Sequence, residues 1–241
     1  MSNINEKYGE SFIKENLMGP NVIKLAEELA RHMELRRGMR VLDLGCGRAL
    51  SSIYLAKEYG VTVFATDLWI PATENYERIK QMRLEDRIVP IHADAHALPY
   101  ADEFFDAIVS FDSYHYYGTN ERYLNDYLAK LVKKGGQIAF ASPGFTHELS
   151  EEEREELREF NPKGEFLTFH SGEWWKVLLE RTKTVDVVEV FDLDCNAEAW
   201  EDWLDSDNPL AKTDQAFYET VTQLATVGVV ARRNSRDPFL L

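Results

Sequence analysis

Residues 41–50, with the sequence VLDLGCGRAL, run from an apolar segment through an acid into two glycines that are one residue apart. The apolar part is typical of a strand that is buried on both faces of a sheet. A strand that ends in closely spaced glycines usually lets its backbone approach a ligand, because a side chain there would block that approach. We therefore expect a buried strand, a tight turn at Gly45 and Gly47, and a ligand beside the turn.

Short apolar runs alternate with helical segments through the first 143 residues. Strands are predicted at 39–45, 61–67, 87–94, 105–112 and 136–142. The helical segments between them carry end signals: Gly60 closes the first, Pro71 opens the second, and Thr119 caps the third. In the N-terminal region, Pro20 opens a further helix. This alternation predicts right-handed βαβ units and therefore a doubly wound α/β sheet.

The pattern changes after residue 143. A solvated helix is predicted at 149–160, with Ser150 and Glu153 forming a capping box, and a second helix at 171–182. Two late strands, 185–193 and 223–233, flank an aromatic and acidic stretch. We predict a single domain with a seven-stranded, mostly parallel sheet, an antiparallel edge strand, and a helical and aromatic cap. Its parts are N-terminal helices (1–38), a cofactor-binding core (39–143), and acceptor-side insertions with the edge strands (144–241).

Composition excludes several partners. The net charge of −15 arises from 42 acids and 27 bases, and such a surface repels the phosphates of a nucleic acid. The sequence contains no run of 18 apolar residues, and its first ten residues are too polar for a signal peptide. Cys46 and Cys195 form neither a disulfide framework nor a metal-ligand pattern. We expect a cytoplasmic protein with no metal, no membrane partner and no nucleic acid.

Two acids near the glycine turn indicate the kind of ligand. Asp67 ends the second strand about 20 residues after the glycines, where a carboxylate can accept both hydroxyls of a ribose. The third glycine of a dinucleotide-binding turn is replaced by Leu50, and Asp43 would repel a pyrophosphate. A ligand with a ribose and a positive charge but no phosphates fits better. S-adenosylmethionine (SAM) has this chemistry.

The segment from about Arg40 to Ser142 resembles the core of class I SAM-dependent methyltransferases, of the small-molecule groups called type 11 and type 25. Residues 41–47 match the glycine-rich first motif, Asp67 matches the acidic end of the second strand, and 91–110 matches the third-motif region. The resemblance implies a Rossmann-like fold and SAM as the cofactor. It differs at Ala49, where many members have a further glycine. The cofactor contacts that it implies come from Asp43, Gly45, Cys46, Gly47, Asp67, Leu68, Asp94, Ala95 and Ser110.

The stretch DSYHYYG, residues 112–118, is the candidate catalytic segment. It follows the fourth strand at the carboxyl edge of the sheet, where open α/β sheets bind ligands. His115 is a candidate general base, because histidine accepts protons near neutral pH, and the alternative is that it only orients the loop or contacts SAM. Tyr114 and Tyr116 are candidate walls of the acceptor pocket.

The sequence therefore predicts transfer of a methyl group from SAM to a small-molecule acceptor by in-line displacement. Two other functions remain open at this stage. One is a nucleotide-dependent oxidoreductase on a related sheet, against which Leu50 and Asp43 count. The other is a module that binds SAM without catalysing a reaction.

Overall fold

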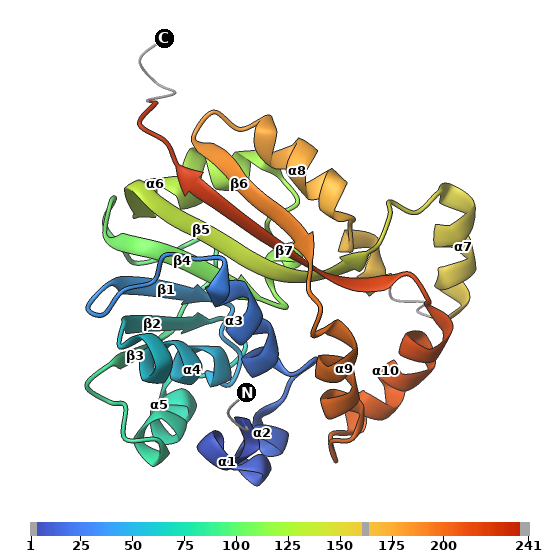
Figure 1. Cartoon of the computed structure of the whole chain (residues 1–241), viewed down its shortest axis with the longest axis horizontal. Helices are drawn as coiled ribbons and strands as arrows, with labels where there is room; N and C mark the ends of the chain where they lie inside the picture. Colours follow the sequence, from blue (N-terminus) through green and yellow to red (C-terminus); the bar gives the residue numbers. More distant parts are fainter. Residues whose placement is uncertain (1–3, 161–163, 237–241) are drawn as a thin grey trace.

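A seven-stranded sheet forms the centre of the computed structural model, which describes residues 4–160 and 164–236 (Figure 1). The strand order is β3-β2-β1-β4-β5-β7-β6. The strands are β1 (Arg40–Leu44), β2 (Thr62–Asp67), β3 (Ile88–His92), β4 (Phe105–Phe111), β5 (Val132–Phe145), β6 (Val185–Asp192) and β7 (Leu224–Arg233). All neighbours from β3 to β5 pair in parallel, while β7 pairs antiparallel with both β5 and β6. The predicted fold class is confirmed, with the antiparallel strand β7 one place inside the edge strand β6.

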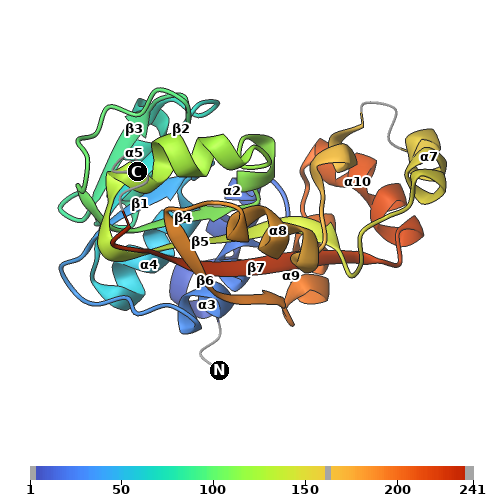
Figure 2. The same cartoon turned by 90° about the horizontal axis from the view of Figure 1, so that it is seen from above.

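Helices cover both faces of the sheet. They are α1 (Ile4–Tyr8), α2 (Glu10–Asn16), α3 (Val22–Arg31), α4 (Leu50–Tyr59), α5 (Ala72–Gln81), α6 (Ala129–Leu131), α7 (Glu151–Phe160), α8 (Gly172–Glu180), α9 (Asn196–Leu204) and α10 (Pro209–Thr220). A π-helical turn, η2 (Tyr123–Leu128), precedes α6, and two short 3-10 turns are η1 (Tyr114–Tyr116) and η3 (Glu165–Thr168). Figure 2 shows the sheet between its helices, with α7 and α10 beyond one end of it.

The consecutive apolar residues of β1 explain this layered arrangement. Val41 packs in one buried cluster with side chains of α3, α4 and α5, whereas Leu42 packs in a second cluster with side chains of η2, α6 and α8. Successive residues of a strand point to opposite faces, so a strand with apolar residues in succession needs cover on both sides. Each fully buried Val or Leu contributes about 1.5–3 kcal/mol relative to an exposed one.

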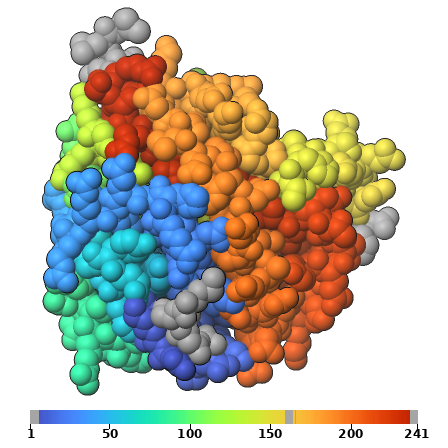
Figure 3. Space-filling model, in the orientation of Figure 1, coloured from blue at the N-terminus to red at the C-terminus, as the bar shows by residue number. Residues whose placement is uncertain are grey.

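The N-terminal segment and the late helices meet near the ends of the strands. The backbone N–H of Asn21 donates to the carbonyl of Ala199 in α9 at 2.8 Å, and Lys24 forms an ion pair with Asp202 at 3.0 Å. Figure 3 shows the N-terminal segment, in blue, against the orange surface of α9. One buried cluster contains residues from α3, β1, α9 and α10, which supports our proposal of a single domain.

Several helix ends follow the sequence signals, and two do not. Gly60 ends α4 in the left-handed conformation, with φ of 64°, and Ser150 and Glu153 form the predicted capping box at 2.8 and 3.2 Å. The cap at the start of the segment before β5 is Asn120 rather than Thr119, because the Asn120 side chain accepts from the N–H of Arg122 at 2.9 Å. Helix α3 begins after Asn21, whose side chain caps it, and not at Pro20.

The acidic and aromatic stretch after β6 folds into α9 and α10. Trp200 and Trp203 are buried between these helices and the core, and the indole N–H of Trp203 donates to Asp214 at 2.9 Å. Among the residues described, no helix has the length and apolar character needed to cross a bilayer.

Arg83, just after α5, adopts a left-handed backbone conformation whose energetic cost can be tested by mutation. It has φ of 56°, and the N–H groups of Arg83 and Leu84 donate to the carbonyls of Lys80 and Ile79, which is the Schellman arrangement that usually places glycine at this position. Arg83→Gly removes the steric cost of this conformation, part of which is offset by glycine's greater freedom in the unfolded chain. We predict a gain of about 0.5–1 kcal/mol in the free energy of unfolding, measured by urea denaturation. Arg83→Ala is the matched control and should show no gain, and equal stabilisation by both variants would contradict the prediction.

Candidate functional site

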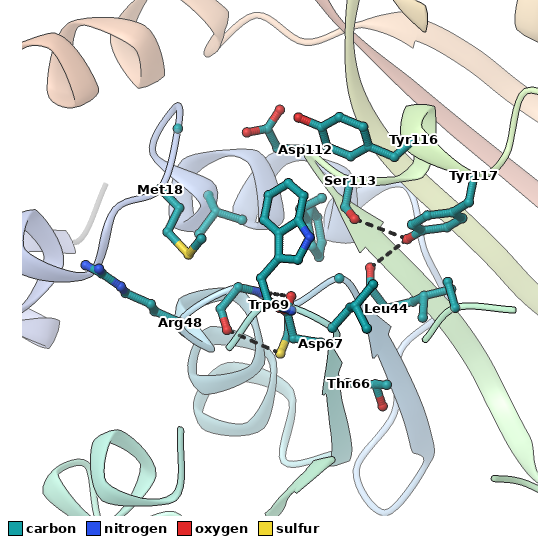
Figure 4. Close-up of a pocket in the computed structure, with 18 of the residues that line it drawn as sticks. Met18, Leu44, Arg48, Thr66, Asp67, Trp69, Asp112, Ser113, Tyr116 and Tyr117 are labelled. Atoms are coloured by element: carbon teal, nitrogen blue, oxygen red, sulfur yellow. Dashed lines mark hydrogen bonds between the residues drawn. The ribbon is translucent and has the colours of Figure 1, made fainter. Parts of the chain in front are cut away.

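A cavity of about 370 Å³ opens where β1, β2, β3 and β4 end (Figure 4). This is the carboxyl edge of the parallel part of the sheet, and the volume lies in the range of small-molecule sites. The lining comes from five segments of the described chain. They are the N-terminal segment (Asn16, Met18, Gly19, Pro20 and Val22), the glycine turn (Leu44 to Arg48, and Leu50), the end of β2 (Thr66 to Trp69), the loop after β3 (Ala93 to His96), and the end of β4 (Phe111 to Ser113, Tyr116 and Tyr117).

The glycine turn has the conformation that its sequence requires. Gly45 and Gly47 have φ of 73° and 51°, and the N–H groups of Gly45 and Cys46 donate to the Thr66 carbonyl at 2.8 and 3.1 Å. A Cβ on Gly45 would lie 1.9 Å from Oγ of Ser113, whereas a Cβ on Gly47 would lie 3.1 Å from Sδ of Met18. Gly45 is thus required by the loop after β4 as well as by the turn, and Gly47 faces the N-terminal segment.

Asp67 connects the two loops that face the cavity. One carboxylate oxygen, Oδ2, accepts from the N–H of Gly47 at 2.8 Å. The other, Oδ1, accepts from the N–H groups of Trp69 and Ile70 at 2.7 and 2.9 Å. A carboxylate oxygen accepts about two hydrogen bonds, so Oδ2 retains one acceptor position for a ligand hydroxyl. The side chain is only 8% exposed, and that exposed part borders the cavity.

The loops after β2 and β3 supply an apolar and an acidic wall. Leu68 and Trp69 are 51% and 67% exposed, which is high for large apolar side chains that line a cavity. Asp94 accepts from the N–H of His96 at 2.8 Å, and this bond, together with the His96 ring, lowers the pKa of Asp94. The Ala95 carbonyl accepts from the Tyr123 hydroxyl at 2.9 Å, which fixes this loop.

Two of the predicted cofactor contacts lie behind the cavity wall. Asp43 is fully buried, and its Oδ2 accepts from the hydroxyls of Ser51 and Ser52, both at 2.6 Å, so that it joins β1 to α4. Burial raises the pKa of Asp43 to about 6. Ser110 is also buried and hydrogen-bonds the Tyr117 hydroxyl at 3.0 Å. Neither side chain lines the cavity, because each one satisfies a polar group inside the fold.

The structure also corrects the positions predicted for Tyr114 and His115. The η1 turn directs Tyr114 into the core, where its ring stacks on Phe140 with centroids 4.2 Å apart. His115 is 1% exposed, its ring is 4.0 Å from that of Tyr116, and its Nδ1 has no partner among the described residues. Burial lowers the pKa of His115 to about 3. A general base at this position is therefore not supported, and only Tyr116 of the three reaches the cavity.

Asp112 and the N-terminal segment are cavity residues that the sequence reasoning did not select. Asp112 directly follows β4, and burial and the nearby Asp214 raise its pKa to about 7. An acid at the carboxyl end of a central strand is a signal that was available in the sequence. No comparable signal marks residues 16–22, because their place beside the cavity depends on how α3 packs against α9.

Within 4–160 and 164–236, no group of three His, Cys, Asp or Glu side chains is arranged to hold a metal ion.

Residues 42–140 match the family described as "Methyltransferase domain". This part of the chain is therefore similar to methyltransferase domains. It is 31% identical over 119 residues to the methyltransferase GfsG of Streptomyces halstedii. That alignment covers 49% of this chain and 42% of GfsG, so the chain matches less than half of its relative's length.

Solved structures share the fold at low sequence identity. The [4+2]-cyclase SpnF has a TM-score of 0.72 at 15% identity, and the match covers 96% of this chain and 93% of SpnF. Phosphoethanolamine N-methyltransferase 2 of Haemonchus contortus, solved in complex with SAM, has a TM-score of 0.70 at 18% identity, over 97% of this chain and 59% of that chain. At these identities the similarity shows the fold of the methyltransferase domain and its flanking helices, and nothing finer.

The burial of His115 predicts a pH effect on stability. In the unfolded chain a histidine takes up a proton below about pH 6.5, while the folded His115 stays neutral down to about pH 3. The unfolded state then binds more protons, so the free energy of unfolding falls as the pH decreases from 6.5, by at most about 1.4 kcal/mol per pH unit. His115→Gln should reduce this slope between pH 6.5 and 5, as measured by urea denaturation at several pH values. Identical slopes for the variant and the wild type would show that His115 titrates like an exposed histidine.

Proposed function

We propose that the protein transfers a methyl group from SAM to a small-molecule acceptor. The observation that carries this proposal is the cavity at the carboxyl edge of the sheet, where the glycine turn, the Asp67 carboxylate and the exposed Leu68 and Trp69 face one space. The methyltransferase domain provides the family context.

The residues of the cavity fit SAM. Oδ2 of Asp67 has one acceptor position left for a ribose hydroxyl, and Gly45 and Gly47, both at positive φ, carry no side chain that would block a ligand from the backbone of the turn. Leu68 and Ala95 would contact the adenine, with Asp94 beside its amino group. Arg48 also lines the cavity, and its guanidinium group donates to the Glu15 carbonyl of the N-terminal segment at 2.7 Å.

When bound, SAM supplies an activated methyl group on a sulfonium, which is already an excellent leaving group. The chain then has to hold the acceptor in line and keep water out, since alignment and exclusion of water provide much of the rate. Gly19 and Pro20 border the cavity on one side, and Tyr116 and Tyr117 border it on another. The Tyr117 hydroxyl donates to the Leu44 carbonyl at 3.1 Å, which holds the loop after β4 against the glycine turn.

The two alternative functions are weaker on this geometry. A dinucleotide would need a glycine where Leu50 is buried at the start of α4. The argument that Asp43 repels phosphates loses force, because this carboxyl group lies beneath the turn. A module that binds SAM without catalysis has the same cofactor contacts, and the exposed aromatic side chains beside the cavity argue for a second ligand. Mass spectrometry of the small molecules retained on purification separates SAM from NAD or FAD.

We also infer a cytoplasmic setting and free small molecules as acceptors. Cys46 and Cys195 are both free thiols, which suits a reducing compartment. The net charge of −15 disfavours a nucleic acid as the acceptor.

Asp67→Ala tests the assignment of the cofactor. The substitution removes a charged acceptor of the ribose and the group that holds the Gly47 N–H, so we expect SAM affinity to fall by about 1–3 kcal/mol, roughly 5- to 150-fold. Titration calorimetry measures the affinity, and thermal unfolding measures how far the variant is also destabilised. Asp102→Ala, at an exposed acid before β4, is the matched control and should bind SAM as the wild type does. Unchanged affinity in a folded Asp67→Ala protein would reject the assignment.

A further inference from the structure

We propose that the methyl acceptor is a small amine whose positively charged nitrogen binds between Asp112, Trp69 and Tyr116 (Figure 4). This inference rests on the proposed methyl transfer and adds the chemical class of the acceptor. Figure 4 shows these three side chains on the same side of the cavity, with the Trp69 ring between Asp67 and Asp112 in this view.

The carboxylate of Asp112 has no positive partner among residues 4–160 and 164–236. No hydrogen bond or ion pair involves its oxygens within the described residues, and the charged group that acts on it is another acid, Asp214 of α10. Asp214 is itself held by the indole N–H of Trp203 at 2.9 Å. A partly buried carboxylate beside a second acid is unfavourable unless a cation neutralises it. A cationic ligand in the cavity would supply that charge.

The position of Asp112 is fixed by the backbone around it. The residue has φ of 50°, and its N–H donates to the Ala141 carbonyl of β5 at 2.8 Å. A Cβ on Gly19 would lie 2.3 Å from Oδ2 of Asp112, so the N-terminal segment passes directly beside the carboxylate. These contacts hold the charge at the edge of the cavity, where a ligand can reach it.

Two exposed aromatic rings complete the site. Trp69 is 67% exposed and Tyr116 is 52% exposed, and their ring centroids lie 5.7 Å apart with the planes inclined by 58°. The faces of Trp and Tyr rings attract ammonium groups, most strongly when a ligand is partly desolvated. Two such rings beside a carboxylate favour a cation over a phenol or a carboxylic acid.

The charges of the whole cavity agree with this preference. Among the described residues that line it, three are acids, and Arg48 and His96 are the basic ones. The acids are Asp67, Asp94 and Asp112, and the guanidinium of Arg48 donates to the Glu15 carbonyl at 2.7 Å. Asp214 adds a fourth acid close to Asp112.

Asp112 is also placed to take the proton that an amine must lose before it reacts. The carboxylate accepts a proton from the ammonium group, and the freed electron pair of nitrogen forms a bond to the methyl carbon. The bond between that carbon and sulfur breaks, and its electron pair stays on sulfur. The proton leaves Asp112 for solvent when the product departs. A pKa of about 7 suits a group that takes up and releases a proton near neutral pH.

Binding of choline and of its neutral analogue 3,3-dimethylbutan-1-ol tests the site without requiring turnover. The two molecules have nearly the same shape and differ in charge. Titration calorimetry is done with the protein saturated with S-adenosylhomocysteine (SAH), the demethylated form of SAM. We expect the wild type to bind choline at least 10-fold more tightly than the alcohol. Asp112→Asn, which preserves the shape of the side chain, should reduce this preference to less than 3-fold, with SAH affinity within 2-fold of the wild type.

Two further variants complete the experiment, the first as a control and the second as a test of the aromatic ring. Asp102→Asn removes an exposed acid at the opposite edge of the sheet and should leave the preference for choline unchanged. Trp69→Leu, at a side chain that is 67% exposed, should weaken choline binding at least 5-fold and leave the binding of the alcohol nearly unchanged.

The outcomes separate this inference from the proposed function. Equal binding of choline and the alcohol by a wild type that binds SAH would overturn the amine site and leave methyl transfer in place. A loss of SAH affinity above 10-fold in Asp112→Asn would also overturn it, because Asp112 would then hold the cofactor. If the wild type does not bind SAH at all, the proposed function itself fails.

Discussion

The three hydrogen bonds that Asp67 accepts hold the cavity in shape. They run from the N–H of Gly47 in one loop and from the N–H groups of Trp69 and Ile70 in the next. A carboxylate can accept several N–H bonds at once, and charge-assisted bonds of this kind are roughly twice as strong as neutral ones. The turn after β1 and the loop after β2 are therefore fixed relative to each other, and the ligand surface between them is formed before any ligand binds.

Other parts of the fold hold the turn after β1 and the loop after β2 in place. Parallel pairing of β1 with β2 and β4 brings the ends of all three strands to one edge of the sheet. Asp43 lies beneath the turn and ties β1 to the start of α4 through Ser51 and Ser52. On the open side, contacts between Asn21 and α9 hold the N-terminal segment beside the cavity. The late helices thus act on the site from a distance, through the segment that they support.

Sequence patterns predict the sheet well, because buried parallel strands are short apolar runs and the turns between them need particular residues. Gly45, Gly47 and Asp67 were found by this reasoning, since each has a backbone or charge requirement that few other residues meet. His115 shows where such reasoning ends. Its place after β4 is as expected, but the η1 turn rotates its ring inward, away from the cavity, and no pattern in the sequence records that rotation.

Contacts between segments that are far apart in the chain also could not be predicted from the sequence. Met18 and Gly19 line the cavity only because α3 packs against α4 and α9. Helix α9 lies about 180 residues after Met18 in the chain. The Asp112 carboxylate gains its raised pKa from burial and from Asp214, which lies on α10. Hydrophobic periodicity identifies each of these helices separately, but the way in which they pack together decides which charges meet at the site.

Hydrogen–deuterium exchange with and without SAH tests most directly whether this cavity is the cofactor site. Peptides from 16–22, 44–50, 66–70 and 93–96 line it, and their amides should exchange more slowly when SAH is bound. Exchange in 101–104, at the opposite end of β4, should not change. Protection confined to segments outside the cavity, or no protection at SAH concentrations that saturate binding, would contradict this account of the site.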